Sequence, residues 1–202
     1  MPVNLNDPRV KRTRQLMMQA FTELLEQKRN IYSISVHDIA TKATVNRATF
    51  YTHFEDKFAF LEYWMSEKSR VILRKRIPYE SKFNSEYLPT LIQTVFEFLV
   101  GFRQNMTPGD KQFEPMFEIA MQKEVHYLLL KWLREENHTM VSKERLEATA
   151  LVVSWGIFGA ALHWSRNPNG QSVDKMVTEV LEVVATNLAP ILEFRTDKGS
   201  GS

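Results

Sequence analysis

The residues best suited to chemistry lie in one short stretch, ATVNRATFYTHFEDK, at residues 43–57. In a helix, Phe50 and Phe54 are four residues apart and share one face, which predicts that both are buried. The opposite face then carries small and polar side chains at the same spacing: Arg47 with Tyr51, Ala48 with Thr52, and Thr49 with His53. Such a face is suited to close contact with a polar surface.

A helix of this kind fits the DNA major groove, which is about 12 Å wide and accepts one helix. The guanidinium of Arg47 can donate two hydrogen bonds to guanine, and Ala48 or a threonine methyl can contact a thymine methyl. Other polar groups suit phosphate oxygens, contacts that fix register without reading sequence: Thr49, Tyr51 and His53 here, Lys57 at the start of the next helix, and Ser35 and His37 at the start of the preceding one. The alternative is an ordinary helical hairpin, because helix–turn–helix pairs also occur in all-α proteins with no DNA role.

The sequence contains no arrangement typical of catalysis. Its five histidines do not form an H-E-x-x-H or comparable metal-ligand spacing, and there is no G-x-S-x-G, P-loop or dinucleotide-binding glycine pattern. The absence of cysteine excludes disulfides, thiolate chemistry and cysteine-based zinc sites, and is compatible with a reducing cytoplasm. We therefore expect a cytoplasmic protein that is not an enzyme and that needs no metal or cofactor.

Charge is distributed unevenly along the 202 residues. Residues 1–76 contain 14 Lys and Arg against 8 Asp and Glu, whereas residues 77–202 contain 12 against 16. A basic N-terminal third on an acidic remainder favours a polyanionic partner for one end, although ordinary variation in surface charge remains the alternative. No signal peptide or membrane span is expected, because the N-terminus lacks an apolar stretch and no long uninterrupted apolar run occurs.

Apolar spacing of 3.6 residues recurs along almost the whole chain, and no strand-like alternation competes with it. The sequence therefore predicts an all-α fold. Helices are expected at about residues 9–27, 35–43, 46–54, 55–76, 85–104, 113–137 with a break near Gln122, 143–166 and 173–192.

The segment IATKATVNRATFYTHFEDK closely resembles the signature of the tetracycline-repressor (TetR) family of bacterial transcriptional regulators. That pattern reads Ile-Ala-x-x-Ala-Gly-Val-Ser and, after a threonine-containing helical turn, Tyr-x-His-Phe-x-x-Lys. The matching positions are Ile39, Ala40, Ala43, Val45, Thr49, Tyr51, His53, Phe54 and Lys57. The upstream RVKRTRQLMMQAFTELLEQK also looks like the family's first helix, so the match covers about residues 9–64.

Two positions depart from the family pattern. Thr44 replaces the usual turn glycine, and a positive φ there costs a β-branched residue on the order of 1–2 kcal/mol unless the turn avoids that conformation. Asn46 replaces serine, which leaves helix capping intact.

The resemblance implies a three-helix DNA-binding domain at residues 8–64, with the helix–turn–helix at about 35–54. A helical domain for ligand binding and dimerisation follows at 65–194, and 195–202 is expected to be a disordered tail or a cloning remnant. By this resemblance, Arg47, Ala48 and Thr52 face base edges, and His37 faces either bases or phosphates. The implied phosphate contacts are Ser35, Thr49, Tyr51, His53 and Lys57.

A homodimer is also implied, with its interface on the last two long helices. Independently, residues 148–164 are apolar nearly all round, which predicts burial on several sides, and small residues there permit close helix approach. The expected interface residues are Val153, Gly156, Ala160, Val177 and Val184. The alternative is that residues 148–164 form the central helix of a monomer.

The middle of the chain is rich in Phe, Met and Trp, side chains that would suit a small apolar or aromatic effector. The expected pocket residues are Phe96, Met116, Phe117, Met121 and Trp155, with ordinary core packing as the alternative. The resemblance implies a dimeric repressor that such an effector releases from a palindromic operator in double-stranded DNA. The alternative function is a helical ligand-binding or interaction protein with a weak or vestigial DNA head.

Overall fold

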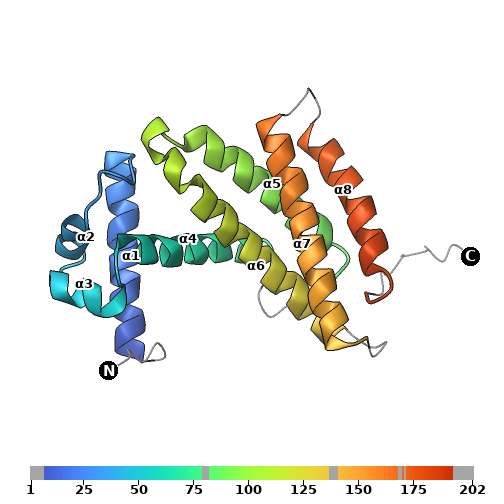
Figure 1. Cartoon of the computed structure of the whole chain (residues 1–202), viewed down its shortest axis with the longest axis horizontal. Helices are drawn as coiled ribbons and strands as arrows, with labels where there is room; N and C mark the ends of the chain where they lie inside the picture. Colours follow the sequence, from blue (N-terminus) through green and yellow to red (C-terminus); the bar gives the residue numbers. More distant parts are fainter. Residues whose placement is uncertain (1–6, 79–81, 137–140, 168–169, 171, 193–202) are drawn as a thin grey trace, which may run out of the picture. The chain divides into compact units, whose positions relative to one another are not determined.

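The computed structural model describes residues 7–78, 82–136, 141–167, 170 and 172–192, and within these ranges every regular element is helical (Figure 1). The all-α prediction is confirmed. In order, the elements are α1 (Pro8–Lys28), α2 (Val36–Lys42), α3 (Arg47–His53), α4 (Lys57–Arg74), α5 (Tyr87–Asn105), the 3-10 helix η1 (Pro108–Phe113), α6 (Glu114–Glu135), α7 (Lys143–Arg166) and α8 (Val173–Leu188). The expected tail at 195–202 lies outside the described residues.

The chain divides into two compact units. The first comprises Met1–Glu67 and Met106–Phe117, and the second comprises Lys68–Asn105 and Glu118–Ser202. Helices α4 and α6 therefore each begin in the first unit and end in the second. The sequence placed a boundary near residue 64 but gave no sign that the segment Met106–Phe117 packs with the N-terminal helices.

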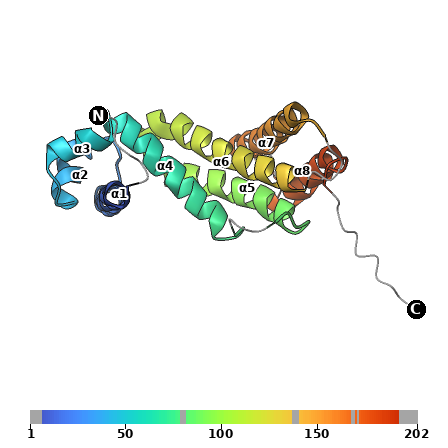
Figure 2. The same cartoon turned by 90° about the horizontal axis from the view of Figure 1, so that it is seen from below.

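Aromatic rings hold the first unit together. Phe21 of α1 meets Phe60 of α4 at a centroid distance of 5.4 Å, and Phe50 of α3 meets the same Phe60 ring at 5.5 Å. Phe54, just after α3, also packs edge-on against Phe60 at 5.1 Å. Each buried phenyl ring contributes on the order of 1.5–3 kcal/mol. In this unit α2 and α3 consequently lie together on one side of α1 (Figure 2).

The turn between α2 and α3 has the conformation that usually requires glycine. Thr44 has φ of 55°, so the alternative that the turn avoids positive φ is wrong. The turn closes with hydrogen bonds from the Thr44 N–H to the Thr41 carbonyl and from the Val45 N–H to the Ala40 carbonyl. Asn46 then caps α3, because its side-chain oxygen accepts from the Ala48 N–H at 2.9 Å.

The second unit is a helical bundle in which α5 contacts both α7 and α8, and α7 contacts α8. Helix α6 runs without interruption from Glu114 to Glu135, so the expected break near Gln122 is wrong. The buried Gln122 side chain is accommodated because its amide donates to Ser154 Oγ of α7 at 3.2 Å. Helix α8 ends at Leu188, four residues earlier than expected.

Among the described helices, α7 alone has the length and apolar composition that a membrane-crossing helix would need. The same properties are expected of a helix that occupies the middle of a bundle. Its buried residues, which face the rest of the second unit, are Leu146, Ala150, Val153, Ser154, Ile157, Phe158, Ala161 and Trp164.

Substituting Thr44→Gly is expected to raise the free energy of unfolding by about 1 kcal/mol, because glycine adopts positive φ without a Cβ clash. Urea denaturation of both proteins measures the change. Thr44→Ala serves as the control, since alanine keeps the Cβ and should recover little of the gain. A Thr44→Gly protein less stable than the parent would contradict this account of the turn.

Candidate nucleic-acid interface

Helix α3 presents two different faces. Phe50 has no exposed surface, and Phe54 is also buried. Arg47, Ala48, Tyr51 and Thr52 are exposed, whereas Thr49 and His53 are half-buried. The predicted burial of Phe50 and Phe54 is therefore confirmed, and of the three pairs predicted to face outward, the pair Thr49 and His53 is only partly exposed. The DNA contacts themselves stay predictions.

Arg47 and Tyr51 interact along the outer face of α3. An Arg47 Nη2 hydrogen donates to the Tyr51 hydroxyl at 3.2 Å, and the guanidinium carbon lies 5.6 Å from the centre of the tyrosine ring. Both side chains are exposed, so the pairing keeps the guanidinium extended over α3. A guanidinium held in this way loses less conformational freedom when it binds a planar acceptor.

The start of α2 is fixed by a reciprocal cap. The Ser35 hydroxyl accepts from the Asp38 N–H at 3.1 Å and donates to Asp38 Oδ2 at 2.8 Å, while the Ser35 N–H donates to the same oxygen. Hydrogen bonds from Ser35, followed by one from Lys28, lower the pKa of Asp38 to about 2. The Ser35 hydroxyl proton is already donated to Asp38. The predicted contact with a phosphate therefore requires that this proton be shared between the two acceptors or that the hydroxyl rotate away from Asp38. His37 is exposed beside it.

Arg14 of α1 fixes the end of α3, a role that the sequence alone did not reveal. Its Nη2 donates to the His53 carbonyl at 2.9 Å, and its guanidinium lies over the rings of Phe54 and Tyr63 at 4.8 and 4.9 Å. A cation at a helix C-terminus is favourable for the helix dipole. Burial, with a smaller effect from Arg14, lowers the pKa of His53.

Lys57 has a structural role in addition to the phosphate contact predicted for it. Its ammonium donates to the carbonyl oxygens of Ile31 and Tyr32 at 2.8 and 3.2 Å. Burial lowers the pKa of Lys57, and the negative charge of Asp110 opposes this shift. Two of the three ammonium hydrogens are thus engaged with the turn before α2.

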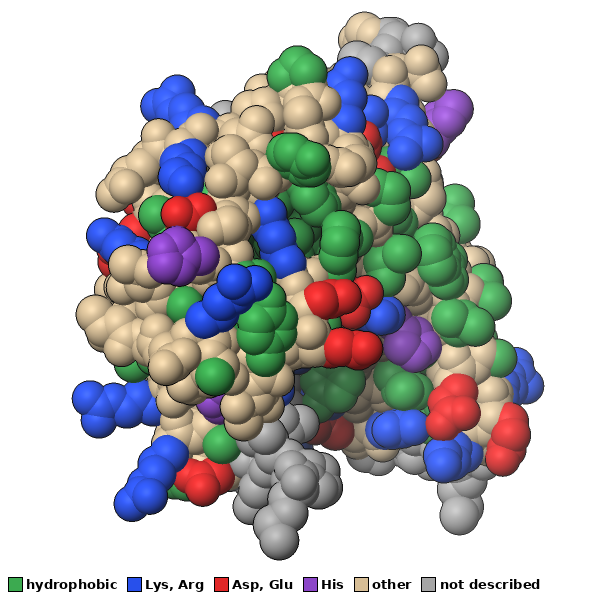
Figure 3. All heavy atoms as spheres, turned by 60° about the vertical axis from the view of Figure 1, so that its left-hand side comes forward, with side chains coloured by type: hydrophobic (Ala, Val, Ile, Leu, Met, Phe, Trp, Pro, Cys, Tyr) green, Lys and Arg blue, Asp and Glu red, His purple; other side chains and the backbone are tan. Residues whose placement is uncertain are grey.

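The surface shown in Figure 3 carries separate Lys and Arg side chains around an area that is mostly neutral and polar. In the first unit, the exposed basic residues before α2 include Arg9, Lys11 and Arg12 at the start of α1. Among the residues that the structure describes, no group of His, Asp and Glu is arranged to hold a metal ion.

The interface residues predicted on α7 and α8 differ in exposure. Val153, Val177 and Val184 are buried in the core of their own chain and are at most 8% exposed. Gly156 is exposed and Ala160 half-buried. An interface on α7 and α8 stays a prediction, and periodicity could not tell which apolar stripe faces inward when a helix is apolar nearly all round.

The residues predicted to line an effector pocket are divided between the two units. Met116 and Phe117 belong to the first unit, where Phe117 packs edge-on against Trp64 at 5.8 Å. Phe96 and Met121 are fully buried in the second unit, and Trp155 is 51% exposed on α7. An effector pocket lined by these residues stays a prediction, because composition does not distinguish core packing from cavity lining.

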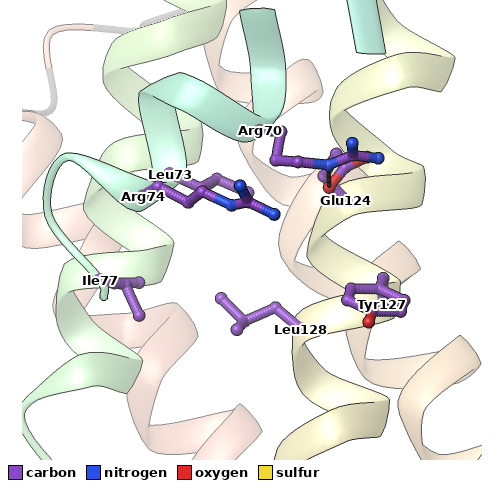
Figure 4. Close-up of a pocket in the computed structure, with 7 residues that line it drawn as sticks. All are labelled: Arg70, Leu73, Arg74, Ile77, Glu124, Tyr127 and Leu128. Carbon is purple, nitrogen blue, oxygen red and sulfur yellow. Dashed lines mark hydrogen bonds and ion pairs between the residues drawn. The ribbon is translucent and has the colours of Figure 1, made fainter. Parts of the chain in front are cut away.

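The second unit contains a shallow hollow of about 20 Å³, open to solvent, between the end of α4 and α6 (Figure 4). Arg70 spans it with a two-pronged hydrogen bond to the Glu124 carboxylate, at 3.2 and 3.0 Å. Leu73, Ile77 and Leu128 give it an apolar lining, and the remaining lining residues are Arg74 and Tyr127. Apolar spacing in the sequence gave no signal for this hollow.

Comparisons with known proteins bear on both units. No family model matches the chain. Over 56 residues it is 39% identical to an uncharacterized HTH-type transcriptional regulator, YxbF, of Bacillus subtilis (strain 168). That match covers 28% of this chain and 15% of the relative's own length.

Solved structures are similar over most of the chain. The TetR-family repressor AlkX from Dietzia sp. aligns at a TM-score of 0.59 and 16% identity, covering 88% of this chain and 98% of that one. A TetR-family transcriptional regulator from Pectobacterium atrosepticum aligns at 0.55 and 12% identity, covering 93% and 97%. The flavonoid-responsive regulator FrrA aligns at 0.53 and 14% identity, covering 87% and 96%.

The chain has the all-α fold of TetR-family transcriptional regulators. The fold likeness extends over both units, and the sequence likeness is to a protein of the helix–turn–helix class. Both findings agree with the resemblance carried by residues 39–57.

The α2 cap predicts a pH dependence. Asp38 has a folded-state pKa of about 2, below its ordinary value of 3.8, so its stabilising effect is complete above pH 4 and is lost as pH falls toward 2. Asp38→Asn should lower the free energy of unfolding by about 1 kcal/mol near pH 7, with the difference from the parent narrowing below about pH 4. Urea titrations from neutral to acidic pH measure this difference. A difference that stays constant across that range would show that the carboxylate charge is unimportant.

Proposed function

We propose that this chain is a dimeric, DNA-binding transcriptional regulator, acting as a repressor that a small molecule releases from a palindromic operator. One observation carries the proposal: α3 buries Phe50 completely while Arg47, Ala48, Tyr51 and Thr52 stay exposed on its other side. The TetR-regulator fold supports it. Repression, in place of activation, rests on the habit of the family that the sequence resembles.

In the proposed complex, α3 enters the major groove. Arg47 donates to guanine, the side chains of Ala48 and Thr52 lie against base edges, and His37 reaches from α2. Thr49, Tyr51 and His53, with Ser35 and Lys57, contact phosphates and set the register. The small side chains of Ala48 and Thr52 let the helix backbone approach the bases closely.

Two copies would associate through α7 and α8. Val152 is 68% exposed, and Leu151 and Trp155 on α7 and Val183 on α8 are also exposed apolar side chains. An apolar surface of this kind typically marks an interface. Gly156 and Gly159 lie on the same helix with open space where a Cβ would be, which permits close approach of a second helix. A symmetric dimer would place two α3 helices on half-sites about 34–36 Å apart.

The effector is proposed to bind in the second unit. The hollow beside Arg70 encloses only about 20 Å³, so an effector would require the surrounding apolar side chains to move apart. By thermodynamic linkage, a molecule that weakens DNA binding must itself bind less tightly when DNA is present.

Arg47→Ala should weaken binding to the preferred duplex by about 1–3 kcal/mol and relax the preference at one base pair. The duplex is obtained by sequencing DNA that the purified protein retains from a random pool, and dissociation constants are measured on it and on single-base variants. Arg145→Ala is the control, since it removes the same charge from an exposed position at the start of α7.

An equal loss on specific and random DNA would contradict base reading by Arg47. A functional DNA-binding domain should lose affinity steeply as salt concentration rises, and its affinity for specific sites should persist to higher salt than its affinity for random DNA. Weak binding without sequence preference would favour the alternative function, a helical ligand-binding protein with a vestigial head.

Val152→Glu should convert the dimer to monomers at micromolar concentration while leaving each protomer folded, because the substituted side chain is already exposed. Sedimentation and thermal unfolding measure the two effects. Ile119→Glu on α6 is the matched control, since it also adds a charge at an exposed apolar position. A wild-type monomer, or a Val152→Glu protein that remains dimeric, would contradict the proposed interface.

A further inference from the structure

The segment Met106–Phe117 joins α5 to α6, yet it packs with the N-terminal helices. Phe113 is buried, with its ring centre 6.3 Å from that of Phe58, and Phe117 meets Trp64 at 5.8 Å. A part of the chain far from the helix–turn–helix in sequence therefore belongs to the same compact unit.

Asp110 of this segment binds the turn that precedes α2. Its carboxylate is buried, and Oδ1 accepts from the N–H groups of Ile31 and Tyr32 at 2.8 and 3.3 Å. Oδ2 accepts from the Thr107 hydroxyl at 2.7 Å. A buried carboxylate is stable only when such donors replace its water, so these contacts are individually strong.

Lys57 binds the same two residues through their carbonyl groups. It donates to the carbonyl oxygens of Ile31 and Tyr32, whereas Asp110 accepts from their N–H groups. The two side chains have opposite charge, and Asp110 opposes the burial-driven fall in the Lys57 pKa. The three peptide groups that join residues 30 to 33 are thus each held by at least one charged side chain.

The turn that contains Ile31 and Tyr32 leads directly into α2. Ile31 and Ile34 are buried, and the Ile34 N–H donates to the Ile31 carbonyl at 3.3 Å one residue before the Ser35 cap. The contact with the 106–117 segment is close, because a Cβ at Gly109 would lie 3.3 Å from Asn30 Nδ2. The position of the turn therefore sets where α2 begins.

We propose that Asp110 is a positioning residue for DNA binding: by holding residues 31 and 32 it sets the start of α2 and, through the α2–α3 turn, the presentation of α3 to the duplex. The inference rests on the proposed function. Asp110 lies four residues before α6, so a residue from the second half of the sequence would help to position the helices proposed to contact DNA.

Three variants test the proposal. Asp110→Ala removes every acceptor, whereas Asp110→Asn keeps one oxygen for the two backbone N–H groups. Thr22→Val is the matched control: it removes the hydrogen bond from Trp64 Nε1 to Thr22 Oγ1, at 3.1 Å within the same unit, and does not touch the turn.

Using duplex retained by the wild-type full-length protein, we expect Asp110→Ala to bind roughly tenfold or more weakly, in line with the loss of a buried charged acceptor. Asp110→Asn should recover most of that affinity. Thr22→Val should bind like wild type even if its melting temperature falls as far as that of Asp110→Ala.

Hydrogen exchange of the Ile31 and Tyr32 amides provides a readout that does not depend on DNA. Asp110→Ala should speed exchange at these amides beyond any change at the core amides of α1. Unchanged exchange there, or a loss of DNA affinity that Thr22→Val reproduces at equal stability, would overturn the proposal. If the wild-type protein binds DNA without sequence preference, the proposed function is contradicted instead. The exchange rates of the Ile31 and Tyr32 amides would then still show whether Asp110 stabilises the turn.

Discussion

Burial of the Phe50 ring is the constraint on which the outer surface of α3 depends. A seven-residue helix is too short to be stable alone, so packing must supply its stability. Phe50 and Phe54 both pack against Phe60 of α4, which itself meets Phe21 of α1. Since side chains four residues apart share a helix face, burying these two rings turns the Arg47 face outward.

Charged side chains add to the aromatic core in positioning α2 and α3. Arg14 donates to the last carbonyl of α3, Lys57 donates to the turn before α2, and Asp110 accepts from the same turn. Each contacts backbone, so each fixes the course of the chain as well as a side-chain position. The helix–turn–helix is thereby held at both ends by residues that lie outside it, and α1, α4 and η1 each provide one of them.

Local patterns were sufficient for much of this unit. The Phe50–Phe54 spacing predicted which face of α3 is buried, and Asn46 was expected to keep the helix cap before α3. The role of Asp110 could not be predicted, because it depends on a contact across 79 positions of sequence. In the second unit, α7 is apolar nearly all round, so periodicity could not separate the buried Val153 from the exposed Val152. Thr44 showed the converse: an unfavourable residue type is held at positive φ by the turn's hydrogen bonds and the packing on either side of it.

The central claim is that the exposed face of α3 is the surface that meets DNA. Backbone amide resonances of the full-length protein, recorded before and after adding the duplex that it selects, test this most directly. The account predicts that the largest changes fall on residues 47–53 and at the start of α2, with little change in the buried core of the second unit. Saturating DNA that leaves residues 47–53 unperturbed while shifting resonances elsewhere would contradict it.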